Sequence, residues 1–229
     1  MIWKYNCLVA KLLLFLSMNK KDVSNKVPIY KLKTTKEIMQ HYDKWGNKYD
    51  QDMVDWNYTG PKETVNIFKK YATGKDIKIF DAGCGTGLVG IELKKFGYVN
   101  IDGADLSKKL LDLVPSGFYK KLEQIDLNKP LNKKSNIYEA VLCVGTFTFG
   151  HVKPPALDEL IRITKNKGLI CFTINEGIYE EYGFDKKIDE LKKLKKWNIK
   201  EFFKSDYIKS KDVNAWLCLA EVIKWLKKN

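Results

Sequence analysis

The chain has 229 residues, of which 45% are hydrophobic and 13% aromatic, and its 41 basic and 28 acidic side chains give a formal net charge of +13. This length fits one domain with a small appendage, and the hydrophobic fraction excludes a wholly disordered chain. Arg162 is the only arginine, whereas proteins that read nucleic acid favour arginine, so we expect no specific nucleic-acid partner. No apolar run reaches the ~18–20 residues of a membrane span, and we expect no membrane partner.

The amino-terminal region and the cysteines carry weak signals. Residues 1–18 loosely imitate a signal peptide, but Lys11 interrupts the apolar run and no cleavage site follows. We expect residues 1–33 to form a poorly ordered extension, in which Met18 is a candidate start. The five cysteines have neither metal-knuckle nor redox-pair spacing. We therefore expect reduced thiols, no metal site and a cytoplasmic location.

Two helices are predicted next, within residues 34–75. Apolar and aromatic residues recur at three- and four-residue steps from Thr34 to Tyr49. The second helix begins at Pro61, because proline is favoured in the first helical turn, and it ends near Tyr71.

From residue 76 to residue 229, short apolar strands alternate with helices. The expected strands are 77–80, 99–104, 121–125, 139–144, 168–174, 202–208 and 215–222. The expected helices are 88–96, 107–114, 155–164 and 184–197. This alternation predicts an α/β domain with a mostly parallel sheet that helices cover on both faces.

The segment 79–88 reads IFDAGCGTGL, a strand followed by three alternating glycines and a helix. Glycine tolerates positive φ and lets a ligand approach the backbone, while the start of the helix presents unpaired N–H groups. In open α/β sheets, nucleotide-like ligands bind at such a turn. We therefore expect Gly83, Cys84, Gly85 and Gly87 to contact a cofactor.

Two classes of cofactor compete for this turn. Residues 85–90 match the dinucleotide pattern G-x-G-x-x-G, which is weak on its own. Asp81 ends the preceding strand, where its carboxylate would repel a pyrophosphate. S-adenosylmethionine carries an ammonium and a sulfonium group instead, so Asp81 favours this cofactor.

Asp81, Gly83, Gly85 and Gly87 together satisfy the pattern D/E-x-G-x-G-x-G, and the chain thus resembles class I S-adenosylmethionine-dependent methyltransferases. Segments 42–50, 84–89 and 157–168 are similar to the Williams–Beuren syndrome region methyltransferase family (methyltransferase-like protein twenty-seven). The resemblance spans roughly residues 38–222. It implies a Rossmann-like, doubly wound, seven-stranded sheet whose last strand is antiparallel. It also implies that residues 34–75 form a helical lid over the cofactor, with Trp45 and Tyr49 as candidate lid residues.

Further cofactor contacts are expected at the ends of the other strands. Asp105, with Leu106 beside it, ends the second strand, where a carboxylate can accept hydrogen bonds from ribose hydroxyls; a helix-capping role is the alternative. The resemblance implies that Asp126 and Leu127 lie at the adenine and Val144 along the cofactor. A surface turn explains Asp126 nearly as well.

Methyl transfer from a sulfonium depends mainly on positioning, and a general base is needed only when the acceptor must lose a proton. His151 follows the fourth strand and is our candidate catalytic residue; a loop histidine without a chemical role is the alternative. No N-P-P-Y or D-P-P-Y sequence follows that strand, which favours a small molecule or an exposed side chain as the acceptor.

The predicted function is therefore S-adenosylmethionine-dependent methyl transfer, with S-adenosylhomocysteine as the product, by a monomeric enzyme. Three alternatives remain: an NAD-type dinucleotide-dependent oxidoreductase, a non-catalytic S-adenosylmethionine-binding module, and a lysine-rich RNA-associated methyltransferase.

Overall fold

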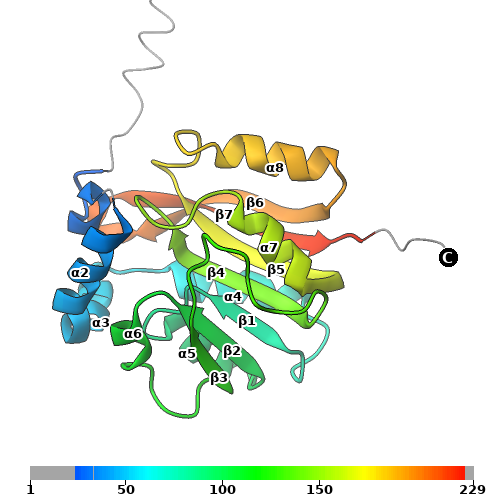
Figure 1. Ribbon diagram of the computed structural model, residues 1–229, viewed down its shortest axis with the longest axis horizontal. Coiled ribbons are helices and arrows are strands. Elements are labelled where there is room, and N and C mark those ends of the chain that lie inside the picture. The colour runs from blue at the N-terminus through cyan, green and yellow to red at the C-terminus, as the bar shows by residue number, and fades with distance from the viewer. Residues whose placement is uncertain (1–23, 33, 225–229) are drawn as a thin grey trace, which may run out of the picture.

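A computed structural model describes residues 24–32 and 34–224, which form a seven-stranded sheet in the order β3-β2-β1-β4-β5-β7-β6 (Figure 1). The strands are β1 (Ile79–Ala82), β2 (Ile101–Asp105), β3 (Lys121–Gln124), β4 (Tyr138–Phe147), β5 (Thr164–Asn175), β6 (Trp197–Ile208) and β7 (Val213–Val222). The helices are α2 (Thr35–Trp45), α3 (Tyr49–Asp55), α4 (Gly60–Tyr71), α5 (Leu88–Lys95), α6 (Lys108–Leu111), α7 (Ala156–Ile163) and α8 (Phe184–Lys193).

Strand pairing confirms the doubly wound, mostly parallel sheet. β1 pairs in parallel with β2 and β4, and β2–β3 and β4–β5 are also parallel. β7 runs antiparallel to both of its neighbours, β5 and β6, as expected for the last strand. The carboxyl ends of β1 to β4 therefore meet at one edge of the sheet, where ligands bind in open α/β folds.

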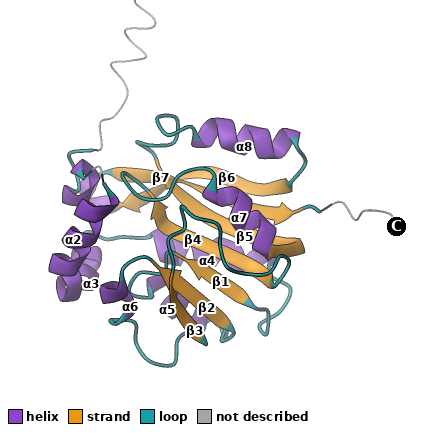
Figure 2. Ribbon diagram, viewed as in Figure 1, coloured by secondary structure: helices purple, strands orange, loops and turns teal. Residues whose placement is uncertain are grey.

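Helices cover both faces of the sheet, with α4 and α5 behind it and α7 and α8 in front in Figure 2. Side chains alternate between the two faces along each strand. Phe80 and Val141 belong to the core beneath α7 and α8, whereas Ile79 and Leu142 belong to the core beneath α4 and α5. This two-sided burial explains why the central strands read as nearly continuous apolar runs.

The predicted helix over 34–49 is interrupted. Thr34 caps α2 through a capping box with Glu37. α2 ends at Trp45, its C-cap Gly46 has φ +38°, and a 3₁₀ turn over Gly46–Lys48 leads into α3 at Tyr49. The two helices thus meet at a bend and lie beyond the end of the sheet (Figure 1).

Residues 24–32 depart from the expected poorly ordered extension. Val27, Ile29 and Tyr30 have exposed fractions of 2%, 4% and 7%, so this segment packs into the core. Apolar burial of this kind stabilises the segment against the domain. Residues 1–23, including the candidate start Met18, lie outside the described residues.

The helix predicted over 184–197 is too long. α8 ends at Lys193, and Trp197 already begins β6. The chain reverses through Lys195, whose φ is +50°, and Lys196 N donates to Leu191 O at 2.9 Å. The helix predicted over 107–114 is shortened in the same way, to Lys108–Leu111. Within the described part of the chain, no helix has the length and apolar character needed to cross a membrane.

Candidate active site

A cavity lies at the carboxyl ends of β1 to β4, beneath α2 and α3. It holds about 840 Å3 of empty space when its open mouth is included. Ten of the residues expected at the site line it: Tyr49, Gly83, Cys84, Gly85, Asp105, Leu106, Asp126, Leu127, Val144 and His151. Asp81, Gly87 and Trp45 are not among its lining residues.

The glycine turn lines the cavity with the backbone of Gly83 and Gly85, which carry no side chain. Gly83, Gly85 and Gly87 all have positive φ, of +77°, +54° and +94°, which side-chain-bearing residues rarely adopt. A Cβ on Gly83 would lie 2.1 Å from Thr146 Oγ1, so this position also needs glycine for space. A Cβ on Gly85 would meet only Leu110, at 3.9 Å, because Gly85 faces the open cavity. Gly87 instead serves as the N-cap of α5.

Asp105 joins the end of β2 to the glycine turn. Its Oδ2 accepts the Gly85 N–H at 2.9 Å and its Oδ1 accepts the Ser107 N–H at 2.8 Å. Burial raises the pKa of Asp105, and the backbone hydrogen bonds oppose this rise. Two backbone donors therefore fix the carboxylate, and each oxygen keeps a lone pair free for a ligand.

Asp81 lies behind the turn and is fully buried. Its Oδ2 accepts a hydrogen bond from the Tyr119 hydroxyl at 2.6 Å, while Oδ1 has no hydrogen-bond partner among the described residues. Burial raises the pKa of Asp81 to about 7, against the lowering effect of Tyr119. An unpaired buried carboxylate oxygen is costly, and a cation in the cavity would relieve that cost.

The charge of the cavity fits S-adenosylmethionine. Asp105 and Asp126 are its acidic lining residues, and no lysine or arginine is found among the described residues that line it. A pyrophosphate would be desolvated there without a compensating cation. A sulfonium with an ammonium group is favoured instead.

His151 lines the cavity but is already engaged at both ring nitrogens. Nδ1 lies 2.6 Å from Phe149 O, and because a carbonyl can only accept, Nδ1 carries the proton. Nε2 therefore accepts the hydrogen bond from the Tyr42 hydroxyl, at 3.0 Å. Burial lowers the pKa of His151 to about 4. The imidazole is thus neutral and holds Tyr42, on α2, against the loop that follows β4.

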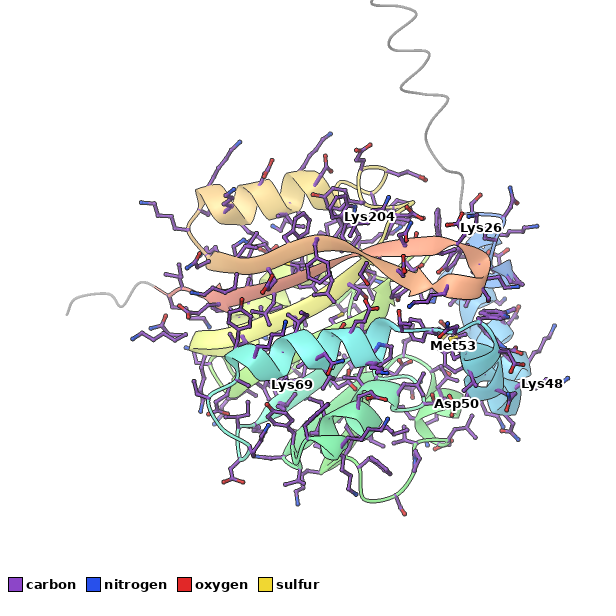
Figure 3. All side chains as sticks on the ribbon, turned by 180° about the vertical axis from the view of Figure 1, so that it is seen from behind. Lys26, Lys48, Asp50, Met53, Lys69 and Lys204 are labelled. Carbon is purple, nitrogen blue, oxygen red and sulfur yellow. The ribbon has the colours of Figure 1, made fainter. Side chains whose placement is uncertain are left out.

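The candidate lid residues Trp45 and Tyr49 contact each other, with ring centroids 4.9 Å apart, but only Tyr49 lines the cofactor cavity. Tyr49 faces the cavity, whereas Trp45 stacks on Tyr42 and donates its indole N–H to Asp52 at 2.5 Å. A contact that the sequence did not predict ties α3 to the glycine turn: Thr86 Oγ1 donates to Asp50 Oδ1 at 2.6 Å. Figure 3 shows Asp50 and Met53 on the side of α3 turned toward the sheet and Lys48 at the outer edge.

A second, smaller cavity adjoins the first, and sequence reasoning missed most of its residues. Tyr42, Tyr49, Tyr58 and Gly145 line both cavities. Tyr58 and Tyr207 place their hydroxyl oxygens 3.2 Å apart beside Gly145. Tyrosines this far apart in the sequence share no local motif, so only the fold reveals that they meet.

Comparison with known proteins agrees with this geometry. A family model described as a methyltransferase domain matches residues 79–168. Human methyltransferase-like protein 27 is 31% identical over 166 residues, which cover 69% of this chain and 67% of that protein.

Solved structures show the same fold. A methyltransferase candidate in a complex with the Trm112 activator of Haloferax volcanii has a TM-score of 0.63 at 13% identity, covering 82% of this chain and 98% of that chain. A candidate S-adenosylmethionine-dependent methyltransferase from Methanococcus maripaludis has a TM-score of 0.59 at 14% identity, covering 84% and 95%.

The family match includes β1, the glycine turn and β4, the segments that build the floor of the cavity. The cofactor of this chain is therefore S-adenosylmethionine, and the product formed from the cofactor is S-adenosylhomocysteine. The chain belongs to the class I S-adenosylmethionine-dependent methyltransferases, in the family of methyltransferase-like protein 27.

Proposed function

We propose that the enzyme methylates a small molecule or an exposed side chain by in-line displacement. The observation that carries the proposal is a cavity at the carboxyl ends of β1 to β4 that has a glycine turn and carboxylates in its wall, and no cation among its described lining residues. Positioning is the main requirement of this reaction, because S-adenosylmethionine, when bound, supplies a methyl group that already has a good leaving group.

Each strand end contributes one part of the proposed cofactor site. Asp105, held by two backbone donors, accepts hydrogen bonds from the ribose hydroxyls. Asp126, with Leu127, lies at the adenine, and Val144 lies along the cofactor. The backbone at Gly83 and Gly85 faces the methionine part, and Asp81 supports it from behind with negative charge.

We propose His151 as a positioning residue for Tyr42. Their hydrogen bond joins the loop after β4 to α2, within the proposed lid of residues 34–75. The Thr86–Asp50 hydrogen bond joins α3 to the glycine turn and supports the same lid. Residues 76–229 are then the catalytic core.

We also propose a cytoplasmic location and a monomeric state for the enzyme. Cys84, Cys143, Cys171 and Cys218 are buried free thiols, which supports a reducing, cytoplasmic compartment. We propose a monomer, and size-exclusion chromatography with light scattering tests this state. Human methyltransferase-like protein 27 and the Methanococcus maripaludis protein are methyltransferases by name, so neither supports the oxidoreductase or the non-catalytic module.

Calorimetry with S-adenosylmethionine, S-adenosylhomocysteine and NAD tests the proposal. We expect the first two to bind and NAD not to bind. Asp105→Ala should make the binding free energy of S-adenosylhomocysteine less favourable by ~1–3 kcal/mol, because the substitution leaves polar partners unpaired. Asp105→Asn should have a smaller effect on the same binding free energy. Asp112→Ala, which removes an exposed carboxylate after α6, is the matched control. NAD binding without S-adenosylhomocysteine binding would refute the proposal.

A further inference from the structure

The second cavity is a chamber of aromatic side chains. It holds about 370 Å3 of free space, counting its mouth, and five tyrosines line it: Tyr30, Tyr42, Tyr49, Tyr58 and Tyr207. We call it the tyrosine chamber. Trp45 and Trp56 complete the aromatic wall, with their ring centroids 5.4 Å apart. These residues come from the amino-terminal segment, from α2 and α3, from the turn between α3 and α4, and from the end of β6.

The chamber joins the cofactor cavity at Gly145. This glycine has φ +78° and lies where the register of β4 shifts against β5. A Cβ there would lie 2.8 Å from the Tyr58 hydroxyl oxygen and 3.3 Å from that of Tyr207. Along the edge of the sheet, the order is Asp126 after β3, Asp105 at β2, the glycine turn at β1, and then Gly145 and the chamber. An acceptor in the chamber therefore lies beyond the proposed methionine end of the cofactor.

The chamber carries no formal charge among its described lining residues. An anionic acceptor, such as a carboxylate or a phosphate, would lose its hydration there without gaining a cation. Lys211 lies over the Trp56 ring, 5.1 Å from its centroid, but is not a lining residue of the chamber. Aromatic faces and phenol oxygens in such surroundings attract cations.

None of the described residues that line the chamber is able to remove a proton at neutral pH. Burial raises the pKa of Tyr42, Tyr49 and Tyr58 well above the ordinary value of 10, so their hydroxyls stay protonated. His151 has a pKa of about 4, and its Nε2 lone pair is already engaged by Tyr42. A hydroxyl acceptor would need a base here, whereas a neutral amine already offers a lone pair.

We propose that the tyrosine chamber is the acceptor site and that it takes a small neutral amine or nitrogen heterocycle. This inference rests on the proposed function. The nitrogen lone pair forms the N–C bond while the C–S bond breaks and its electrons pass to sulfur. The positive charge thus moves from sulfur to nitrogen, where the aromatic wall stabilises it. A primary or secondary amine then loses one proton to solvent.

A binding experiment tests the charge preference without turnover. The full-length protein is saturated with S-adenosylhomocysteine and titrated by calorimetry with choline and, separately, with 3,3-dimethylbutan-1-ol, its neutral carbon isostere. We expect choline to bind at least tenfold more tightly. Equal or weaker binding of choline would overturn the inference.

A pair of matched variants locates that binding. Trp56 lines the chamber but not the cofactor cavity. Trp56→Leu should therefore lower the affinity for choline at least fivefold and leave the affinity for S-adenosylhomocysteine within twofold. Trp216→Leu is the control, because Trp216 packs on Tyr179 and Phe202, which line neither cavity. Unchanged choline affinity in a folded Trp56→Leu protein would contradict the site. The wild-type comparison decides the charge preference even if this variant does not fold.

Turnover tests the acceptor class. With S-adenosylmethionine labelled in its methyl group, we expect label to reach small amines and nitrogen heterocycles in a mixed panel. Label on carboxylates, phosphates or phenols instead would overturn the inference. Failure of S-adenosylhomocysteine to bind in the cofactor calorimetry would contradict the proposed function itself. Binding of S-adenosylhomocysteine without a preference for choline would contradict only the inference about the chamber.

Discussion

The buried carboxyl group of Asp81 should make the stability of the protein depend on pH. Burial raises its pKa to about 7 from an ordinary value of 3.8, so the folded protein holds this proton more tightly than the unfolded chain. Stability contributed by this group is therefore complete below pH 4 and is lost as the pH rises to 7. The full loss amounts to about 4 kcal/mol.

Asp81→Asn removes this titration. We expect the free energy of unfolding of the variant, relative to the natural protein, to increase by a few kcal/mol between pH 4 and pH 7.5. Urea unfolding at several pH values measures it. Asp76→Asn changes an exposed carboxylate and should give a flat difference; a flat difference for Asp81→Asn as well would contradict the account.

His151 should titrate far below the ordinary range of histidine. Burial lowers its pKa to about 4, so the group costs stability as the pH falls from 6.5 to 4, the opposite trend to that of Asp81. NMR of the two histidines, assigned with His151→Gln and His41→Gln, should show the His151 ring neutral at pH 6. A His151 pKa between 6 and 7 would instead suit a general base.

Among the elements, β4 carries Gly145, which lines both cavities. Gly145→Ala adds a methyl group at a positive φ and 2.8 Å from the Tyr58 hydroxyl. We expect the rate of methyl transfer to fall at least tenfold while the affinity for S-adenosylhomocysteine changes less than threefold. Gly117→Ala, at a positive φ where a Cβ meets nothing within 4 Å, controls for backbone strain. Equal losses in both measurements would place Gly145 in the cofactor site rather than between the two cavities.

Sequence patterns predicted the elements well where a local signal marked them. The order of strand, glycine turn and helix around residues 79–88 was predicted correctly, because the glycines occupy backbone conformations that other residues avoid, although the strand lies at 79–82 and not at 77–80. The end of α8 was missed because Lys195, not a glycine, takes the positive φ there. Tyr30 and Tyr207 were missed for a different reason: they meet only through tertiary packing, which no local periodicity encodes.

The whole molecule combines a basic exterior with an acidic cofactor cavity. Lysines such as Lys48 and Lys69 lie on the outer surface in Figure 3, whereas Asp105 and Asp126 line the cavity. Among the described residues, the cofactor cavity has acidic lining side chains and no lysine or arginine, so the lysines there lie outside it. Long-range attraction of polyanions to such a surface falls with salt, whereas binding of S-adenosylhomocysteine inside the cavity should depend little on it.

Ligand binding should stabilise the whole domain. A ligand at about 100 times its Kd adds ~2.7 kcal/mol to the stability of the folded state. For a domain of this size, that should raise Tm by about 5–10 °C. Differential scanning fluorimetry should show this rise with S-adenosylhomocysteine and none with NAD, and Asp105→Ala should reduce it. An equal rise with NAD would contradict the cofactor assignment.

The floor of the cofactor cavity and most of the chamber wall come from different parts of the chain. The glycine turn, Asp105 and Val144 all lie within residues 79–168, the stretch that matches the methyltransferase domain family. Tyr30, Tyr58 and Tyr207 all lie outside it. Mutation can therefore reshape the chamber and leave the cofactor turn intact. A lineage built on this fold is free to change its substrate by small steps while every intermediate keeps its methyl donor.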